Sequence, residues 1–237
     1  MIVDSLVFAA DGLVAALDGA GIDRAVVCPP RARGHGYDVE NDRVAALVAS
    51  HPERLVGFAR VDPLAPGAAA EAERARGLGL AGLFLHPWED AFRVADPAVD
   101  AVLDERPVVV ATGYPWVSEG LQVAELARRH PETTFVATNG AQINISGLGQ
   151  DDAFLALESC PNLLVQTSGV YREDFLEGVV ARFGPERLLY ASAFPRFDPR
   201  LELLRVRWAP GLGEAERAAI LGGNAAALLG LSGAAAA

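Results

Sequence analysis

Three polar residues that can transfer protons follow short apolar runs of the sequence. His86 comes directly after one run, Asp62 closely follows another, and Tyr114 comes just after a third. A histidine can act as a general base near neutral pH without a metal, and a tyrosine hydroxyl can donate a proton. We therefore predict His86, Asp62 and Tyr114 as catalytic candidates. The alternatives are a hydrogen-bonded scaffold histidine and a tyrosine that only lines a pocket.

Other polar, aromatic and cationic residues stand at comparable places and predict a surface that binds a small substrate. The amide side chains among them can bind polar groups of such a molecule. A plain polar loop is the equal alternative for the amide-bearing segment, which Asn144 and Ser146 extend. The predicted substrate-binding residues are Arg60, Trp88, Asn139, Gln142, Ser168 and Arg196.

Two further reactive side chains have bland interpretations. His35 lies in a glycine-punctuated loop at 31–37, which predicts a lid or an anion-binding loop, and loop flexibility explains it equally well. Cys28 would be a nucleophile only beside a base, so inert packing is favoured. Cys28 and Cys160 match neither a disulfide framework nor a Cys-x-x-Cys motif, which indicates reduced thiols.

The charge of the chain excludes several partners and reactions. The formal net charge is −11, and all 20 Lys+Arg residues are arginines. A phosphate backbone would be repelled, so we expect no nucleic-acid partner, and the absence of lysine excludes Schiff-base catalysis by that residue. No apolar segment has transmembrane length, and the start lacks the positive region of a secretory signal. We expect a soluble, cytoplasmic protein with no membrane partner.

The elements that must position these residues alternate between strand and helix. The 237 residues are about the length of one α/β barrel, and eight alternating units are the number that closes one. Helical spacing occurs in 42–50, 68–77, 120–129, 151–159 and 172–183. Apolar runs predict strands at 2–7, 24–28, 55–61, 81–85, 107–111, 134–138, 163–167 and 187–190.

This order predicts a single α/β domain, a (β/α)8 TIM barrel over residues 1–231, with a flexible tail at 232–237. A doubly wound open sheet is the alternative, but no G-x-G-x-x-G turn follows the first strand. The active site of a barrel forms at the C-terminal ends of its strands, where the candidates above fall. His51 and His130 precede strands instead, so we expect them to be structural.

Four phrases in a specific order give the chain a resemblance to a known family. Residues 4–231 resemble the amidohydrolase-related family of metal-dependent hydrolases and decarboxylases, which includes aminocarboxymuconate-semialdehyde decarboxylase. The resemblance implies an amidohydrolase-like barrel with a metal at its mouth. The phrases are Pro52-Glu53-Arg54-Leu55-Val56-Gly57-Phe58, Leu85-His86-Pro87, Tyr190-Ala191-Ser192-Ala193-Phe194-Pro195 and Asn224-Ala225-Ala226-Ala227-Leu228-Leu229-Gly230-Leu231.

The same resemblance implies that this chain has lost the residues that hold the metal. The family pattern D-x-H-x-H on the first strand reads Asp4-Ser5-Leu6-Val7-Phe8 here, so the apolar residues Leu6 and Phe8 stand where the family has its two histidines. A later histidine of the family corresponds to Asn139, and its aspartate corresponds to Ala193. A catalytic zinc needs about three His, Cys or carboxylate ligands. We therefore expect no metal and no other cofactor at this site, and a blocked or reshaped pocket.

Loss of these ligands leaves three functions open. The first is a non-catalytic homologue that serves as a partner or regulatory subunit of an active amidohydrolase-family enzyme, in a homo-oligomer or a hetero-oligomer with that relative. The second is a metal-independent lyase, decarboxylase or hydrolase that acts on a small polar metabolite. The third is binding of a small molecule without turnover. We favour the first, with the second as its alternative.

Overall fold

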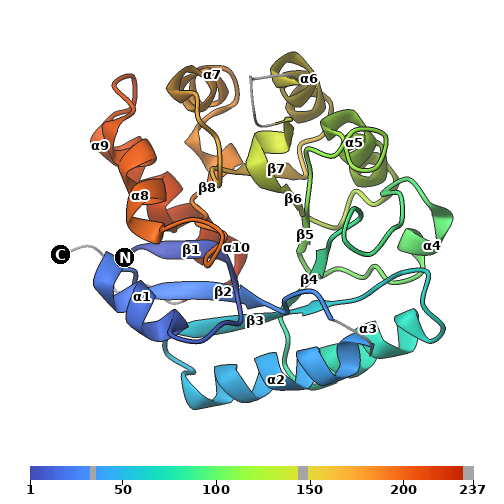
Figure 1. Cartoon of the computed structure of the whole chain (residues 1–237). Coiled ribbons are helices and arrows are strands. Elements are labelled where there is room, and N and C mark those ends of the chain that lie inside the picture. The colour runs from blue at the N-terminus through green and yellow to red at the C-terminus, as the bar shows by residue number, and fades with distance from the viewer. Residues whose placement is uncertain (33–35, 144–148, 232–237) are drawn as a thin grey trace.

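A computed structural model describes residues 1–32, 36–143 and 149–231 (Figure 1). Eight strands form one sheet in sequence order, and each pairs in parallel with the next strand of the chain. Helices alternate with them, which is the pattern of successive β-α-β crossovers. The strands are β1 (Val3–Phe8), β2 (Arg24–Cys28), β3 (Leu55–Arg60), β4 (Gly82–Leu85), β5 (Val108–Val110), β6 (Phe135–Ala137), β7 (Leu163–Gln166) and β8 (Leu188–Leu189).

The two ends of the sheet meet between the last strand and the first. The backbone N–H of Ser5 donates to the carbonyl of Tyr190 at 2.9 Å, and that of Ala193 donates to the carbonyl of Leu6 at 2.8 Å. Residues just beyond β8 thus continue alongside β1 and bring the sheet round into a nearly closed ring. The predicted (β/α)8 barrel is confirmed, and the open doubly wound sheet is excluded.

Helices surround the strands and cover the outer face of the barrel (Figure 1). Short helical turns η1 (Thr138–Ala141), η2 (Pro185–Arg187) and η3 (Ala219–Gly223) complete the connections. The helices are α1 (Leu13–Ala20), α2 (Tyr37–Ser50), α3 (Ala68–Gly77), α4 (Pro97–Asp100), α5 (Gly120–Arg129), α6 (Gln150–Ser159), α7 (Glu173–Phe183), α8 (Pro199–Trp208), α9 (Glu214–Ala218) and α10 (Asn224–Leu228).

Apolar side chains pack on both sides of the strands. One cluster fills the barrel interior and includes Leu6, Phe58 and Phe84, while a second includes Leu17 and Leu83 and lies between strands and helices. Parallel strands covered on both faces read as near-continuous apolar runs, which is why the strand positions are visible in the sequence. The interior is a packed core below the mouth of the barrel, so a ligand at the strand ends would lie at the rim and not inside the barrel.

The predicted boundaries match the observed elements closely, with differences at the ends. Strand β2 and helices α3 and α5 have the predicted limits, whereas α2 begins at Tyr37 rather than at 42. Asp38 and Glu40 lie in its first turn, where negative charge favours a helix N-terminus. Helices α1, α4, α8, α9 and α10 lie outside the predicted segments, and the tail at 232–237 lies outside the described residues.

None of the helices in the described part of the chain combines the length and the apolar character that crossing a membrane would require.

Candidate active site at the mouth of the barrel

A cavity of about 190 Å³ lies at the C-terminal ends of the strands, where barrels carry their active sites. Pockets for drug-sized ligands measure roughly 300 to 1,000 Å³, so this mouth has room only for a small molecule. Its walls combine apolar, aromatic and polar side chains. They are Leu6, Phe8, Phe84, His86, Ala111, Tyr114, Thr138, Asn139, Ser168, Ala193, Arg196 and Phe197.

A row of aromatic rings forms one wall and continues to the surface. Phe8 and Phe84 meet edge to face with ring centroids 5.4 Å apart, and Phe84 meets His86 at 5.8 Å. His86 lies 5.5 Å from Tyr114, which stacks on Trp88 with the ring planes 4° apart. Trp88 is 60% exposed, so the row runs from the barrel interior to solvent. Such a wall favours contact with a flat, apolar ring.

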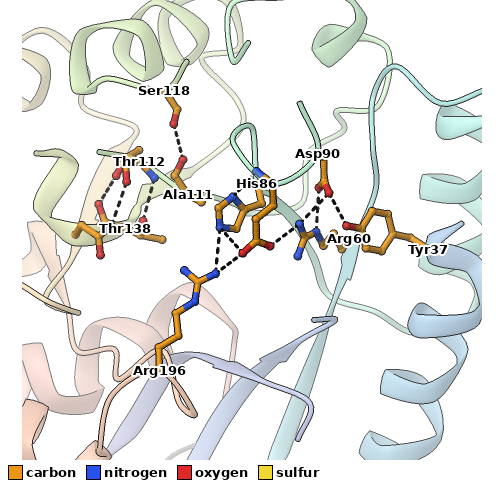
Figure 2. A network of polar contacts seen from close by, with 11 residues as sticks. Tyr37, Arg60, His86, Asp90, Ala111, Thr112, Ser118, Thr138 and Arg196 are labelled. Atoms are coloured by element: carbon orange, nitrogen blue, oxygen red, sulfur yellow. Dashed lines mark hydrogen bonds and ion pairs between the residues drawn. The ribbon is translucent and has the colours of Figure 1, made fainter. Parts of the chain in front are cut away.

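Arg60, at the end of β3, is fully buried beside this wall and is held by acidic and aromatic neighbours (Figure 2). Its Nε donates to Asp90 Oδ2 at 3.0 Å, and its Nη2 donates to Asp90 Oδ1 and to Glu89 Oε2, each at 2.9 Å. The Tyr37 hydroxyl donates to Asp90 Oδ1 at 2.5 Å, and the Tyr37 ring faces the guanidinium. The Nη1 atom of Arg60 has no hydrogen-bond partner among the described residues.

Glu89 joins this buried arginine to a second one at the rim. Its Oε2 accepts from Arg60, and its Oε1 accepts a short hydrogen bond from Nη2 of Arg196. Burial alone would raise the pKa of Glu89, but His86 and the two guanidinium groups beside it lower the pKa below its usual value. Glu89 therefore stays ionised at neutral pH and, together with Asp90, balances the charges of Arg60 and Arg196.

His86 is a buried imidazole that remains neutral. Its Nδ1 accepts from the backbone N–H of Glu89 at 3.3 Å, which places the ring hydrogen on Nε2. Nε2 lies 3.4 Å from Glu89 Oε1 and 3.4 Å from Arg196 Nη2. Burial, together with the nearby Arg60 and Arg196 charges, lowers the pKa of His86 to about 3. In this tautomer Nε2 carries the ring hydrogen beside Glu89 Oε1, and the ring has no free basic lone pair.

A second polar group lies at the ends of β5 and β6 (Figure 2). The backbone N–H of Thr112 donates to Thr138 Oγ1 at 3.0 Å, and Thr112 Oγ1 donates a short hydrogen bond to the Thr138 carbonyl. Asn139 Nδ2 donates to the Thr112 carbonyl at 3.0 Å. Asn139 has a φ of 53°, a left-handed conformation that asparagine adopts more readily than most residues. These contacts fix the Asn139 amide at the cavity wall.

The structure gathers five of the predicted site residues around one cavity. His86, Tyr114, Asn139, Ser168 and Arg196 all line the mouth, although they come from β4 to the segment after β8. The Ser168 hydroxyl is buried and has no partner among the described residues, so it is free to bind a polar group. Their convergence follows from the barrel, because all strand C-termini meet at one end.

The other predicted residues lie around or away from this cavity. Arg60 and Trp88 contact residues of its wall, whereas Asp62 lines a separate cavity of about 620 Å³. The Asp62 carboxylate accepts from the backbone N–H of Leu64 at 3.0 Å, and burial raises its pKa. Asp62 and His86 thus face different spaces. Gln142 is buried and lines neither cavity.

The remaining candidates are Cys28, which does not line this cavity, and three polar residues that the structure does not describe. His35, Asn144 and Ser146 lie outside the described residues. The thiol of Cys28 is fully buried, and burial strongly raises its pKa, which agrees with inert packing. The reactive thiolate would be disfavoured at this position.

Three residues at the centre of the network were missing from the sequence prediction: Tyr37, Glu89 and Asp90. Glu89 and Asp90 directly follow Trp88, so an acidic pair just after a strand that ends at the predicted mouth could have indicated them. A buried arginine at the end of β3 needs such partners. Tyr37 lies at the start of α2 and reaches Asp90 only through the fold.

The described residues at the resemblance's ligand positions do not supply the side chains that a metal of that kind would need. Leu6, Phe8 and Ala193 present only carbon atoms to it, and the Asn139 amide nitrogen is bonded to a carbonyl. The guanidinium carbon of Arg196 lies 5.3 Å from the Phe8 ring centroid, and its positive charge opposes a metal cation nearby. Among residues 1–32, 36–143 and 149–231, no group of three or more His, Cys, Asp and Glu side chains could hold a metal ion.

Solved structures share the fold of this chain at low sequence identity. The 5-carboxyvanillate decarboxylase of Sphingomonas paucimobilis is 20% identical with a TM-score of 0.73, over 92% of this chain and 82% of the enzyme. The 2,6-dihydroxybenzoate decarboxylase of Rhizobium is 17% identical with a TM-score of 0.68, over 95% and 89%. The 4-oxalomesaconate hydratase of Rhodopseudomonas palustris is 16% identical with a TM-score of 0.71, over 97% and 96%.

These likenesses establish the fold alone, and the curated proteins include no significant match. The profile of the family described as Amidohydrolase provides the stronger comparison, because it matches residues 4–231, the span of the resemblance inferred from the motifs. With a barrel of matching architecture and a match that covers nearly the whole sequence, the chain belongs to the amidohydrolase family.

Proposed function

We propose that this chain is a non-catalytic member of the amidohydrolase family that binds a small carboxylated molecule at the barrel mouth and acts as a regulatory partner of an active relative. The observation that carries the proposal is the contact between Phe8 and Arg196 at the mouth of the barrel. Phe8 stands where the family resemblance implies a histidine, and the Arg196 guanidinium lies over the face of the Phe8 ring. A guanidinium at this point can bind an anion but cannot activate a water molecule as a metal does.

The walls of the cavity favour a flat carboxylate over other small molecules. Arg196 supplies positive charge, Ser168 a free hydroxyl, and the aromatic row a surface for a ring. The volume of about 190 Å³ suits one small ring with its substituents. The solved relatives are named for 5-carboxyvanillate, 2,6-dihydroxybenzoate and 4-oxalomesaconate, which supports the same class of ligand.

A metal-independent lyase or decarboxylase is the second candidate. It is favoured by His86 and Tyr114, which lie side by side and face the same cavity as Asn139. The neutral His86 ring would serve as a hydrogen-bond donor to developing negative charge, because its Nδ1 already accepts from the backbone. Turnover that is lost in His86→Ala, with folding intact, would favour this candidate.

The test combines a metal measurement with a binding measurement. Protein purified without chelator from zinc- and manganese-supplemented cells should contain much less than one transition metal per chain by plasma mass spectrometry. It should bind benzoate by calorimetry and return it unchanged by chromatography. One full metal equivalent per chain, or conversion of benzoate-class acids, would overturn the non-catalytic proposal.

The partner role needs a separate experiment. The tagged chain should co-purify with a metal-bearing member of the same family, and the benzoate-loaded chain should change the rate of that enzyme. A stable homo-oligomer that has no effect on any such enzyme would contradict the regulatory role. It would leave simple binding of a carboxylate as the remaining function.

A further inference from the structure

Glu89 places a carboxylate of the chain itself between two arginines at the barrel mouth. One of its oxygens accepts from the buried Arg60 at 2.9 Å, and the other accepts from Arg196 at the rim. Pairing of a carboxylate with guanidinium is also the common way in which proteins bind carboxylated ligands. The positive charge that a ligand would seek is therefore already engaged in the ligand-free chain.

The arrangement leaves buried donors without partners. Nη1 of Arg60 and the hydroxyl of Ser168 lack hydrogen-bond partners among the described residues. Both side chains are fully buried, so water does not reach them. Buried polar groups are normally paired, so an unpaired guanidinium nitrogen is informative. Of these two groups Ser168 lines the mouth. Glu89 therefore does not satisfy every polar group there, and a ligand with its own oxygens could accept from the Ser168 hydroxyl.

Glu89 can leave this position without uncovering an unbalanced buried charge. Arg60 keeps a two-point contact with Asp90, through Nε at 3.0 Å and Nη2 at 2.9 Å. Arg196 has a side chain that is 45% exposed, so water can solvate it. The Glu89 side chain is itself 19% exposed and follows the exposed Trp88 in the loop after β4.

We propose that Glu89 is an internal competitor for the ligand site: a planar carboxylate that enters the mouth displaces the Glu89 side chain from Arg196, and Glu89 turns to solvent. This inference rests on the proposed carboxylate-binding function. It adds a closed state, in which the Glu89 side chain pairs with Arg196 and occupies the place of the ligand carboxylate. Asp90 holds Arg60 in place during the exchange, so only Glu89 and Arg196 rearrange.

The competitor acts through its attachment to the chain. Because Glu89 is tethered to the chain, it competes at an effective concentration on the order of millimolar. A free ligand must bind Arg196 tightly enough to win this competition. The apparent dissociation constant equals the intrinsic constant divided by the fraction of chains in which Glu89 has left Arg196. Weak carboxylates are therefore rejected, and only a ligand that also uses the aromatic wall displaces Glu89.

The experiment measures benzoate binding by calorimetry in the full chain and in matched variants. Glu89→Ala and Glu89→Gln both remove the competing charge, and the second keeps the side-chain shape in case the first disturbs folding. Arg196→Gln removes the guanidinium that the ligand would take. Asp38→Asn removes one negative charge at the start of α2, from a side chain that is not seen to contact Arg60 or Arg196 among the described residues. Benzamide, which has the same ring without a charge, is the ligand control.

The proposal expects benzoate to bind both Glu89 variants at least about tenfold more tightly than the wild type. It expects Arg196→Gln to bind at least about tenfold more weakly, and Asp38→Asn and benzamide to show no comparable gain. Wild-type binding that does not tighten in either Glu89 variant would overturn the competitor and leave the proposed function standing. An equal gain in Asp38→Asn would also overturn it, because general charge would then explain the effect.

Two remaining outcomes separate this inference from the function on which it rests. Benzoate binding in the Glu89 variants but not in the wild type would support the internal competitor and overturn carboxylate binding as the function of the intact chain. No binding in any folded form would overturn both.

Discussion

The guanidinium carbon of Arg196 lies 5.3 Å from the centre of the Phe8 ring, so a cation rests on an aromatic face inside the mouth of the barrel. Phe8 is only 6% exposed and also meets Phe84 edge to face. Contacts of both kinds add to the stability that burial of the ring provides. This pair links the packing of the barrel interior to the charge of its rim.

Phe8→Ala should therefore destabilise the protein substantially. Removal of a buried phenylalanine costs about 3 to 5 kcal/mol, because it leaves a cavity as well as losing apolar burial. Urea unfolding would measure the loss, with Phe8→Leu as a control that keeps most of the volume. A loss below about 1 kcal/mol in Phe8→Ala would show that the ring does not support the mouth.

The stability of the protein should fall in acid because of His86. The pKa of His86 is about 3 in the folded chain and near 6.5 when the residue is solvated. Between these values the unfolded chain binds more protons, so acidification favours unfolding. The free energy of unfolding, measured with urea, should change less between about pH 7.5 and about pH 5 in His86→Gln than in the wild type. His51→Gln, at the opposite end of the barrel, should keep the wild-type difference.

Asp4 should produce the opposite pH dependence. It is fully buried, and burial raises its pKa from 3.8 to about 7, although the backbone N–H of Leu6 and of Ser192 donate to its Oδ1. The folded chain holds this proton more tightly, so its stabilising effect is present below about pH 4 and is lost as pH rises through about 7.

Asp4→Asn should remove this loss. The free energy of unfolding of the variant, relative to that of the wild type, should therefore be higher at about pH 8 than at about pH 4. The amide oxygen can still accept both backbone hydrogen bonds. Asp18→Asn, an exposed carboxylate paired with Arg54, is the matched control. The same pH dependence in the wild type and in Asp4→Asn would show that Asp4 does not titrate between these values.

Two glycines should respond to alanine in opposite directions. A Cβ on Gly82 in β4 would lie 2.4 Å from the Phe58 ring and 2.6 Å from the Pro107 carbonyl, so Gly82→Ala should cost about 1 to 3 kcal/mol. Gly19 in α1 has open space around the added atom, so Gly19→Ala should stabilise by about 0.5 to 1 kcal/mol. Thermal unfolding of the two variants would show whether the signs differ.

The barrel could be predicted from the sequence because its strands are buried on both faces. The apolar run of β2 has the observed limits, and Pro107 to Ala111 surrounds the shorter β5 at Val108–Val110. Helix α1 gave no such indication, because Gly12 at its start provides no side-chain cap and no acidic residue lies in its first turn.

The sequence could predict which residues lie at the end of each strand, but not which of them contact one another. His86 and Arg196 could be placed at the mouth because each follows a strand. The hydrogen bond from Arg196 to Glu89 joins positions 107 residues apart, and a sequence pattern does not report a contact of that kind. Asp62 was placed on the correct end of the barrel, but the direction of its side chain into a separate cavity depends on the turn at Leu64.

Closure of the sheet has a consequence for synthesis of the protein. Ser5 bonds to the Tyr190 carbonyl, a residue 185 positions later in the chain. Before residues 190–194 have been synthesised, β1 has no partner on its outer side and its backbone groups stay available to other strands. The nascent chain is therefore most open to aggregation or chaperone capture until residues 190–194 have emerged.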